Sequence, residues 1–336
     1  MERRIAVELV ARTPTPARYL RSWTPDATVA PAGMWISGVV ADESGNNYWG
    51  LRGADDFLTG MTHVVAPITG FKRLPVSLDP QPPHLFPEYA TIDWFEPLQY
   101  TETTDSTTTA ATTTLRFDSG RIEHDSEGCH WYDAGGRWEL HGHSIGDIVT
   151  IGIPPQDGIA APAYYRHELM SATGSIEGTP VSGYLHQDFA YGPPGKVYAE
   201  LPIIRDLQGM WVSWMQQYDD GSWGGGCCWQ GRDGIAFGPG YQVLDGVTVT
   251  VDDVRATPVV DDQGRLRRLD AALGSVSYTF EFDTAGSPVH YFGRLTDCSR
   301  RPLPVRSWCW VEYAPGMLNG AIMDLVMARY RLARGR

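Results

Sequence analysis

Residues 211–234 read WVSWMQQYDDGSWGGGCCWQGRDG, and this pattern decides the class of fold. Two runs rich in tryptophan and small residues flank Asp219-Asp220-Gly221, a composition typical of the tight turn between antiparallel strands. Because successive side chains of a strand point to opposite faces, the first run divides into two sets: Trp211, Ser213, Met215 and Gln217 on one face, and Val212, Trp214, Gln216 and Tyr218 on the other. The stretch therefore predicts a β-hairpin whose aromatic side chains either fill a core or line a cavity.

A second informative stretch lies upstream, where residues 164–192 read YYRHELMSATGSIEGTPVSGYLHQDFAYG. Alternation places His186 and Asp188 on one face of the predicted strand and Gln187 on the other. An imidazole exchanges protons near neutral pH, and a neighbouring carboxylate orients the ring and stabilises its charged form. Inside an apolar barrel this pair would protonate an alkene or a carbonyl, or remove a proton from carbon. At a strand end it would be a solvated pair.

The start of the same stretch carries another group of titratable side chains. Tyr165 and His167 share one face of the predicted strand, and Arg166 and Glu168 share the other. We expect Arg166 and Glu168 to form a surface ion pair, which stabilises a protein little. His167 either faces the interior beside His186 or lies at a rim, and the pattern favours the surface.

The rest of the chain repeats short strands separated by turn residues. Its 336 residues include 37 glycines and 24 prolines, and 42% are hydrophobic, which favours many short strands around large cores. We predict an all-β protein of two antiparallel barrels, divided into residues 1–155 and 156–336. Residues 101–114 are expected as an edge strand, residues 74–97 as a surface loop, and residues 317–332 as a C-terminal helix packed beside a barrel.

Composition argues against several classes of function. The net charge of −13 disfavours a nucleic-acid partner, which requires clustered lysine and arginine. No stretch reaches the roughly 20 apolar residues that span a bilayer, and the N-terminal residues lack the apolar core of a signal peptide. The five cysteines have no disulfide or zinc spacing, so we expect reduced thiols in a cytoplasmic protein. The sequence leaves open a homodimer.

Glu139, His141 and His143 alternate on one face of another predicted strand. An H-x-H pair with a carboxylate is a potential metal site, with Asp147 or His130 as a further ligand. A polar outer face on a half-buried strand explains the same pattern, so we assign no metal. Because dinucleotide, Walker, nucleophile-elbow and zinc-protease motifs are also absent from the sequence, we expect a mechanism without a cofactor.

The sequence resembles the carotenoid 1,2-hydratase and AttH-like families, a group of two-domain lipocalin-like proteins. The likeness covers about 80 residues. It is carried, in order, by Tyr164-Tyr165, Thr173-Gly174, the V-x-G-x-x-x-x-D motif of Val181 to Asp188, Trp211 and Trp214, Asp220-Gly221 and Asp233-Gly234. The resemblance implies two lipocalin-like (calycin) barrels side by side with a ligand pocket between or within them. It also implies hydration or cyclisation of unsaturated substrates, with His186 and Asp188 in the histidine–acid region.

Together these observations predict an acid–base enzyme, a hydro-lyase or an isomerase (cyclase), acting on an unsaturated hydrophobic molecule such as a terpenoid, polyketide or steroid. The catalytic candidates are His186 and Asp188. The substrate-binding candidates are Tyr165, His167, Trp211, Trp214, Gln216, Trp229 and Tyr241. A non-catalytic carrier or sensor of a lipophilic metabolite is the alternative. A third hypothesis, a glycan-binding β-sandwich, requires the tryptophans to form an exposed row.

Overall fold

The computed structural model describes residues 2–14, 23–56, 61–64, 72–73, 95–97, 99–104, 111–118, 120–125, 128–133, 135–285, 290–300 and 302–313. Regular structure in these ranges is β-strand throughout, apart from a 3-10 turn η3 (Tyr198–Glu200) and a π-helical turn η4 (Ile203–Leu207). The all-β prediction is therefore confirmed. The helix predicted at 317–332 lies outside the described residues. So does the loop predicted at 74–97, except for residues 95–97, which form a strand.

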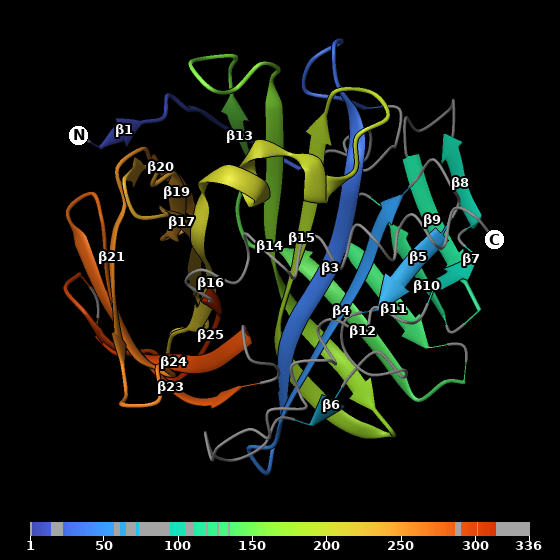
Figure 1. The fold of residues 1–336 in the computed structure, drawn as a ribbon. Helices are drawn as coiled ribbons and strands as arrows, with labels where there is room; N and C mark the ends of the chain where they lie inside the picture. The colour runs from blue at the N-terminus through green and yellow to red at the C-terminus, as the bar shows by residue number, and fades with distance from the viewer. Residues whose placement is uncertain are drawn as a thin grey trace.

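The first sheet contains fourteen strands and curls into a half-barrel (Figure 1). Its main path runs β7-β5-β4-β3-β15-β14-β12-β11-β10-β9-β8, while β13 pairs with β14 and β2, and β6 pairs with β4. These strands are β2 (Glu8–Arg12), β3 (Ala30–Asp42), β4 (Asn47–Asp56), β5 (Met61–Val64), β6 (Lys72–Arg73), β7 (Phe95–Pro97), β8 (Gln99–Thr104), β9 (Ala111–Phe117), β10 (Gly120–His124), β11 (Cys129–Asp133), β12 (Trp138–Ser144), β13 (Ile148–Ile153), β14 (Ala163–Ile176) and β15 (Thr179–Gly192). Residues 101–104, predicted as part of an edge strand, lie on β8 at the end of this path.

The second sheet contains nine strands in the order β20-β19-β17-β16-β25-β24-β23-β22-β21. They are β16 (Gln208–Gln217), β17 (Trp223–Gly231), β19 (Gly240–Leu244), β20 (Val247–Val251), β21 (Arg255–Val260), β22 (Leu266–Leu273), β23 (Val276–Ala285), β24 (His290–Cys298) and β25 (Arg306–Tyr313). The hairpin predicted from residues 211–234 is β16 and β17, and Gly221 takes a φ of +78° in its turn. Two side-by-side barrels are thus confirmed.

The two sheets pack face to face through strands β3, β14 and β15 on one side and β16 and β25 on the other (Figure 1). Alternation sorts the side chains of these strands into three cores. One core fills the first barrel, one fills the second, and the third lies between them and contains tryptophans of both sheets. We call this third region the inter-barrel face.

The chain changes sheet between Gly192 and Gln208, through η3 and η4. Strands β14 and β15 follow the boundary expected at residue 155, yet they hydrogen-bond within the first sheet. The N-terminal strand β1 (Arg3–Arg4) also crosses the expected boundary. It pairs in parallel with β18 (Ile235–Ala236), which follows β17 in the second half of the chain. The two expected halves of the chain therefore interlock: β14 and β15 belong to the first sheet, and β1 pairs with β18.

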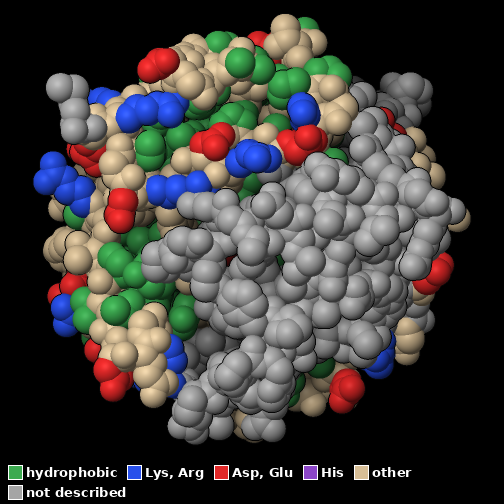
Figure 2. Space-filling view, in the orientation of Figure 1, with side chains coloured by type: hydrophobic (Ala, Val, Ile, Leu, Met, Phe, Trp, Pro, Cys, Tyr) green, Lys and Arg blue, Asp and Glu red, His purple; other side chains and the backbone are tan. Residues whose placement is uncertain are grey.

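The surface carries charges of both signs. On the face shown in Figure 2, acidic and basic side chains of the described residues are interspersed and do not gather by sign. No helix in the described part of the chain is long and apolar enough to cross a membrane.

Candidate active site

His186 and Asp188 lie on the inter-barrel face of β15, and both are buried. His186 Nε2 lies 3.5 Å from Asp188 Oδ2. Glycine lets the backbone approach closely just before this pair, because a Cβ at Gly183 would lie 2.2 Å from the carbonyl oxygen of Val39 on β3. The predicted alternation is correct, since Gln187 points into the first barrel. The solvated position considered for the pair is excluded by its burial.

His167 on β14 is directly opposite Asp188 in the sheet register. Its side chain is fully buried, and its Nε2 lies 3.7 Å from Asp188 Oδ1. The other ring nitrogen, Nδ1, is 2.6 Å from the hydroxyl of Tyr241 on β19. His167 therefore faces the interior, although the sequence favoured the surface, and the Asp188 carboxyl lies beside two imidazoles.

Burial sets the protonation of this group. It raises the pKa of Asp188 well above its usual range, with the charge of Glu312 adding to the effect and a hydrogen bond from Tyr165 opposing it. Burial also lowers the pKa of His167 well below 6.5, helped by His186. It lowers the pKa of His186 to about 3, helped by His290. Desolvation penalises every charged form, so it favours a neutral carboxylic acid beside neutral imidazoles.

Indole rings of the second barrel cover the histidines. Trp211 on β16 has its ring centroid 5.1 Å from that of His186 and 5.9 Å from that of His167. Trp310 on β25 lies 5.2 Å from His186. Trp229 is part of the same aromatic group, with its ring 6.5 Å from Trp211 and 5.0 Å from that of Tyr165. The first barrel thus supplies this group of two histidines and a carboxyl, and the second barrel covers the group with aromatic rings.

Two of the predicted binding residues are not in this group. Trp214 points into the second barrel, where it packs on Tyr278 and Phe280. A Cβ at Gly226 would lie 2.3 Å from the Trp214 ring, so this glycine of the Gly224–Gly226 run makes room for the indole. Gln216 also faces that interior and donates to the Tyr218 hydroxyl at 2.7 Å. Because the tryptophans of this hairpin's first strand are buried, they form no exposed row.

The sequence analysis missed a second histidine–acid pair on the inter-barrel face. His290 on β24 and Glu312 on β25 are opposite each other in register, with Nε2 and Oε1 3.3 Å apart. Gln208 Nε2 donates to the other oxygen of Glu312 at 3.1 Å. Alternation in residues 307–313, which read SWCWVEY, puts Trp308, Trp310 and Glu312 on one face and would have found this carboxylate.

A set of buried polar atoms on the inter-barrel face lacks a hydrogen-bond partner among the described residues. They are Ser37 Oγ, Trp49 Nε1, His167 Nε2, His186 Nδ1, Asp188 Oδ1, Trp211 Nε1, Ser213 Oγ, Trp229 Nε1 and Trp310 Nε1. A buried polar atom without a partner costs about 1–3 kcal/mol, so native proteins keep few of them outside functional sites. At this face these atoms are available as donors and acceptors for a molecule with polar groups, while Gln187 and Gln216 carry further such atoms inside the barrels.

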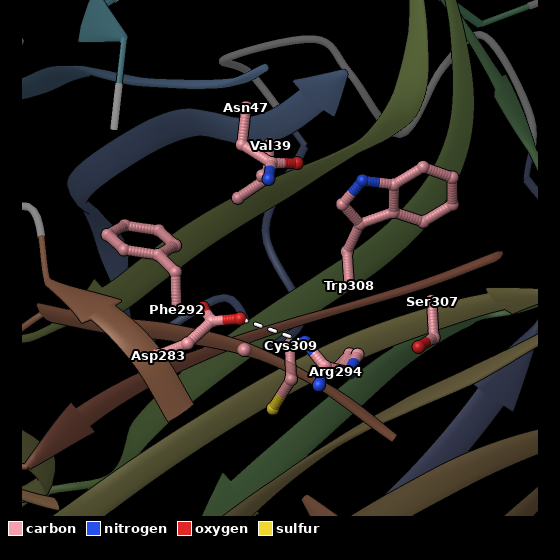
Figure 3. Close-up of a pocket in the computed structure, with 9 residues that line it drawn as sticks. Val39, Asn47, Asp283, Phe292, Arg294, Ser307, Trp308 and Cys309 are labelled. Carbon is pink, nitrogen blue, oxygen red and sulfur yellow. Dashed lines mark hydrogen bonds and ion pairs between the residues drawn. The ribbon is translucent and has the colours of Figure 1, made fainter. Parts of the chain in front are cut away.

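A pocket with a volume of about 100 Å³ opens at one end of the inter-barrel face (Figure 3). Val39 and Asn47 of the first barrel line it opposite Phe292 and Trp308 of the second, and an exposed ion pair between Asp283 and Arg294 lies at its side. Along β3, Val39 is two residues from Ser37, which is the register partner of His186. The pocket therefore lies next to the histidine–acid group along the same face.

The histidines of β12 are elsewhere. Glu139 and His141 form an ion pair of 3.2 Å on the outer face, where the His130 and His141 rings are 4.3 Å apart. No group of three or more histidine, cysteine, aspartate or glutamate side chains that could hold a metal occurs in the part of the chain that the structure describes. The five cysteines are free thiols and all are buried.

No protein-family model matches the chain, and no curated protein matches it. Solved structures are similar to it, including the following two. An AttH-like protein from Nitrosomonas europaea shares 10% sequence identity over 83% of this chain and 91% of its own, with a TM-score of 0.37. Kievitone hydratase from Nectria haematococca shares 9% identity over 91% of this chain and 97% of its own, with a TM-score of 0.37.

Proposed function

We propose that this chain is an acid–base enzyme, acting without a cofactor, that hydrates an unsaturated hydrophobic small molecule held between its two barrels. The same groups would serve dehydration, isomerisation or cyclisation, which share the protonation step. The observation that carries the proposal is Asp188, a buried carboxyl between two buried imidazoles and opposite indole faces. A terpenoid, polyketide or steroid-like substrate suits such walls.

Asp188 is the proton donor in this proposal. Burial raises the pKa of its carboxyl, so the site holds a proton on an acid rather than on an imidazole. A carboxylic acid kept neutral in an apolar site still carries a proton to donate at working pH, whereas an exposed carboxyl of ordinary pKa has already lost it. His186 and His167 flank the carboxyl from two strands.

Protonation of an alkene leaves a carbocation, and the indoles are placed to stabilise it. Trp211 and Trp310 both contact the His186 ring and therefore border the space into which Asp188 donates. An indole face attracts a cation by about 2 kcal/mol or more when both are desolvated. Trp214 takes no part, since it faces the second barrel's interior. A dry site also delays capture of the cation until water is admitted.

The test begins with a ligand. Native mass spectrometry with lipid extraction, on protein purified from its own host, is expected to yield a stoichiometric unsaturated lipophile or its hydrated product. With that compound as substrate, Asp188→Asn and His186→Ala are expected to lower turnover by about 10³-fold while binding is retained. His141→Ala, a histidine on the outer face, is the matched control. Wild-type turnover by both site variants would refute the role of the pair.

The second candidate is a carrier or sensor of a lipophilic metabolite. The specific observation in its favour is the set of buried polar atoms without partners, because these would orient a ligand without any proton transfer. A carrier would release the extracted compound unchanged after prolonged incubation in heavy-isotope water, and Asp188→Asn would alter nothing. Incorporation of solvent oxygen or hydrogen by the wild type, absent in the variant, would exclude this candidate.

A further inference from the structure

We infer that Tyr241 is a positioning residue for the acid: its hydroxyl holds the His167 ring in the tautomer that carries its hydrogen on Nε2, so that this N–H faces Asp188. The inference rests on the proposed function, in which Asp188 donates a proton. It moves Tyr241 from the substrate-binding candidates to a role inside the protein, and it gives the two histidines beside Asp188 different parts.

Alternation along β19 brings Tyr241 to the inter-barrel face. Residues 240–244 read GYQVL, and Tyr241 and Val243 belong to the core between the barrels. Gln242, on the other face of the strand, accepts a hydrogen bond from Tyr278 in the core of the second barrel. The Tyr241 hydroxyl therefore reaches from the second sheet to a histidine of the first.

The hydrogen bond between Tyr241 and His167 has one direction that satisfies both groups. The hydroxyl is 2.6 Å from Nδ1, and both side chains are fully buried. Burial raises the pKa of Tyr241 well above 10 and lowers the pKa of His167 well below 6.5, so a neutral phenol meets a neutral ring. A hydrogen on Nδ1 would leave the phenol's own hydrogen without an acceptor among the described residues. The phenol therefore donates to Nδ1, and the hydrogen of the ring is on Nε2.

The Nε2–H group of His167 faces the carboxyl of Asp188. Nε2 lies 3.7 Å from Oδ1, which is longer than a hydrogen bond, so the group acts as a dipole beside this oxygen. Burial disfavours the carboxylate that remains when Asp188 gives up its proton, and a positive dipole end directed at the oxygen favours it. A neutral ring does this without placing a second charge in the interior.

The other imidazole beside Asp188 has no such partner in the described part of the chain. His186 Nε2 lies 3.5 Å from Oδ2, and its Nδ1 is a buried atom without a hydrogen-bond partner there. No neighbouring hydroxyl therefore selects its tautomer. Tyr241 thus makes His167 the ring with a fixed hydrogen, and His186 is the ring whose tautomer can change when the carboxyl loses its proton.

The first experiment reads the tautomer directly. The full chain is labelled with ¹⁵N in its nine histidines, and long-range ¹H–¹⁵N correlation spectra show which ring nitrogen carries the hydrogen. The His167 signals are assigned by nuclear Overhauser contacts with the ring of Tyr241, whose centroid is 5.6 Å away. We expect one neutral tautomer with its hydrogen on Nε2. A hydrogen on Nδ1 in the wild type overturns the inference, and this result depends on no variant.

Tyr241→Phe then removes the donor and keeps the ring. We expect the His167 signals to become those of a mixture of the two tautomers, because Nδ1 no longer accepts a hydrogen bond. Tyr278→Phe is the matched control, since it removes a buried hydroxyl that donates at 2.6 Å to Gln242 on the other face of β19. The His167 signals of this control should match the wild type. An unchanged His167 spectrum in Tyr241→Phe, or the same change in both variants, overturns the inference.

Steady-state kinetics with the compound recovered by mass spectrometry separates positioning from substrate binding. We expect Tyr241→Phe to lower kcat about tenfold and to leave KM unchanged, because the hydroxyl acts on the acid through His167. A raised KM with unchanged kcat would mean that Tyr241 contacts the substrate, and it overturns the inference. Wild-type turnover by Asp188→Asn refutes the proposed function instead, whereas the tautomer of His167 is still read from the spectra.

Discussion

The interiors of the two barrels are filled by different kinds of side chain. The first buries Arg52, Arg166, Glu168, Gln187 and His124 among its apolar residues. In the described part of the second, the buried polar side chains are neutral amides with phenol partners: Gln216 donates to Tyr218, and Gln242 accepts from Tyr278 at 2.6 Å. The second barrel has an apolar interior with paired amides, whereas the first keeps ionisable side chains in its core.

This difference between the two interiors extends to the side chains that each barrel presents at the inter-barrel face. Burying a charge costs free energy unless it is compensated, and the first barrel compensates Arg166 by stacking it on Trp23 and Phe189 at 4.5 Å and by a 3.0 Å bond to the Tyr191 hydroxyl. Strands β14 and β15 are therefore polar on both faces, and their other face carries His167, His186 and Asp188. The second barrel presents rigid aromatic walls to them.

The largest test of this contrast is Arg166→Met. It removes the cation from a core that also contains Glu168, so a loss of about 3 kcal/mol in the free energy of unfolding is expected, measured by urea denaturation. Arg294→Met, which breaks the exposed pair with Asp283, is expected to change stability little. Equal losses of unfolding free energy in the two variants would show that removing a buried cation of the first barrel destabilises the protein no more than breaking a surface ion pair.

A smaller change in the free energy of unfolding is expected when pH is lowered, and it should come from a histidine inside the first barrel. Burial, with Arg166 and His130, lowers the pKa of His124 to about 3, whereas the unfolded chain has about 6.5. Between these values the unfolded state binds the proton first, so stability falls as pH falls. At pH 5 the loss is about 2 kcal/mol relative to pH 7. His124→Gln should reduce that difference by this amount, and surface His141→Gln should not.

The smallest expected effect is a change in turnover, and it should differ between the two tryptophans of β16. Trp211→Leu is expected to lower turnover about tenfold by removing one aromatic wall, a cost of about 1.4 kcal/mol in the transition state. Trp214→Leu should leave turnover near the wild-type rate and lower stability instead. Equal losses of turnover would show that the two faces of β16 are not functionally separate. The substrate is the compound recovered by mass spectrometry.

The alternation of side chains along strands correctly predicted which residues share a face. It placed His186 and Asp188 together and separated Trp211 from Trp214, because the period of a strand is fixed by its backbone. It failed where polarity was taken to mean exposure. Arg166 and Glu168 were expected as a surface ion pair, yet both are buried, and Glu168 instead accepts a hydrogen bond from Ser144.

The remaining members of the site depend on contacts between strands far apart in sequence. His167 meets Tyr241, and Trp310 meets His186, only because two sheets pack together. No local pattern encodes that packing, so His290 and Glu312 could be assigned to a strand face but not to a partner across it. The change of sheet after Gly192 was missed for the same reason. The sequences of β14 and β15 do not indicate which of the two sheets these strands join.

The pairing of β1 with β18 has a consequence for biosynthesis. Residues 3–5 leave the ribosome early, yet the amides of Arg3 and Ile5 donate to the carbonyls of Gly234 and Ala236. That docking must wait until the β16–β17 hairpin has emerged, so a segment that is translated before the first sheet is among the last to reach its final position. Domains that fold one after another during translation have no such dependency. Ribosome-bound chains that stop short of residue 234 should therefore keep an exposed, protease-sensitive N-terminus, however well the first sheet has formed.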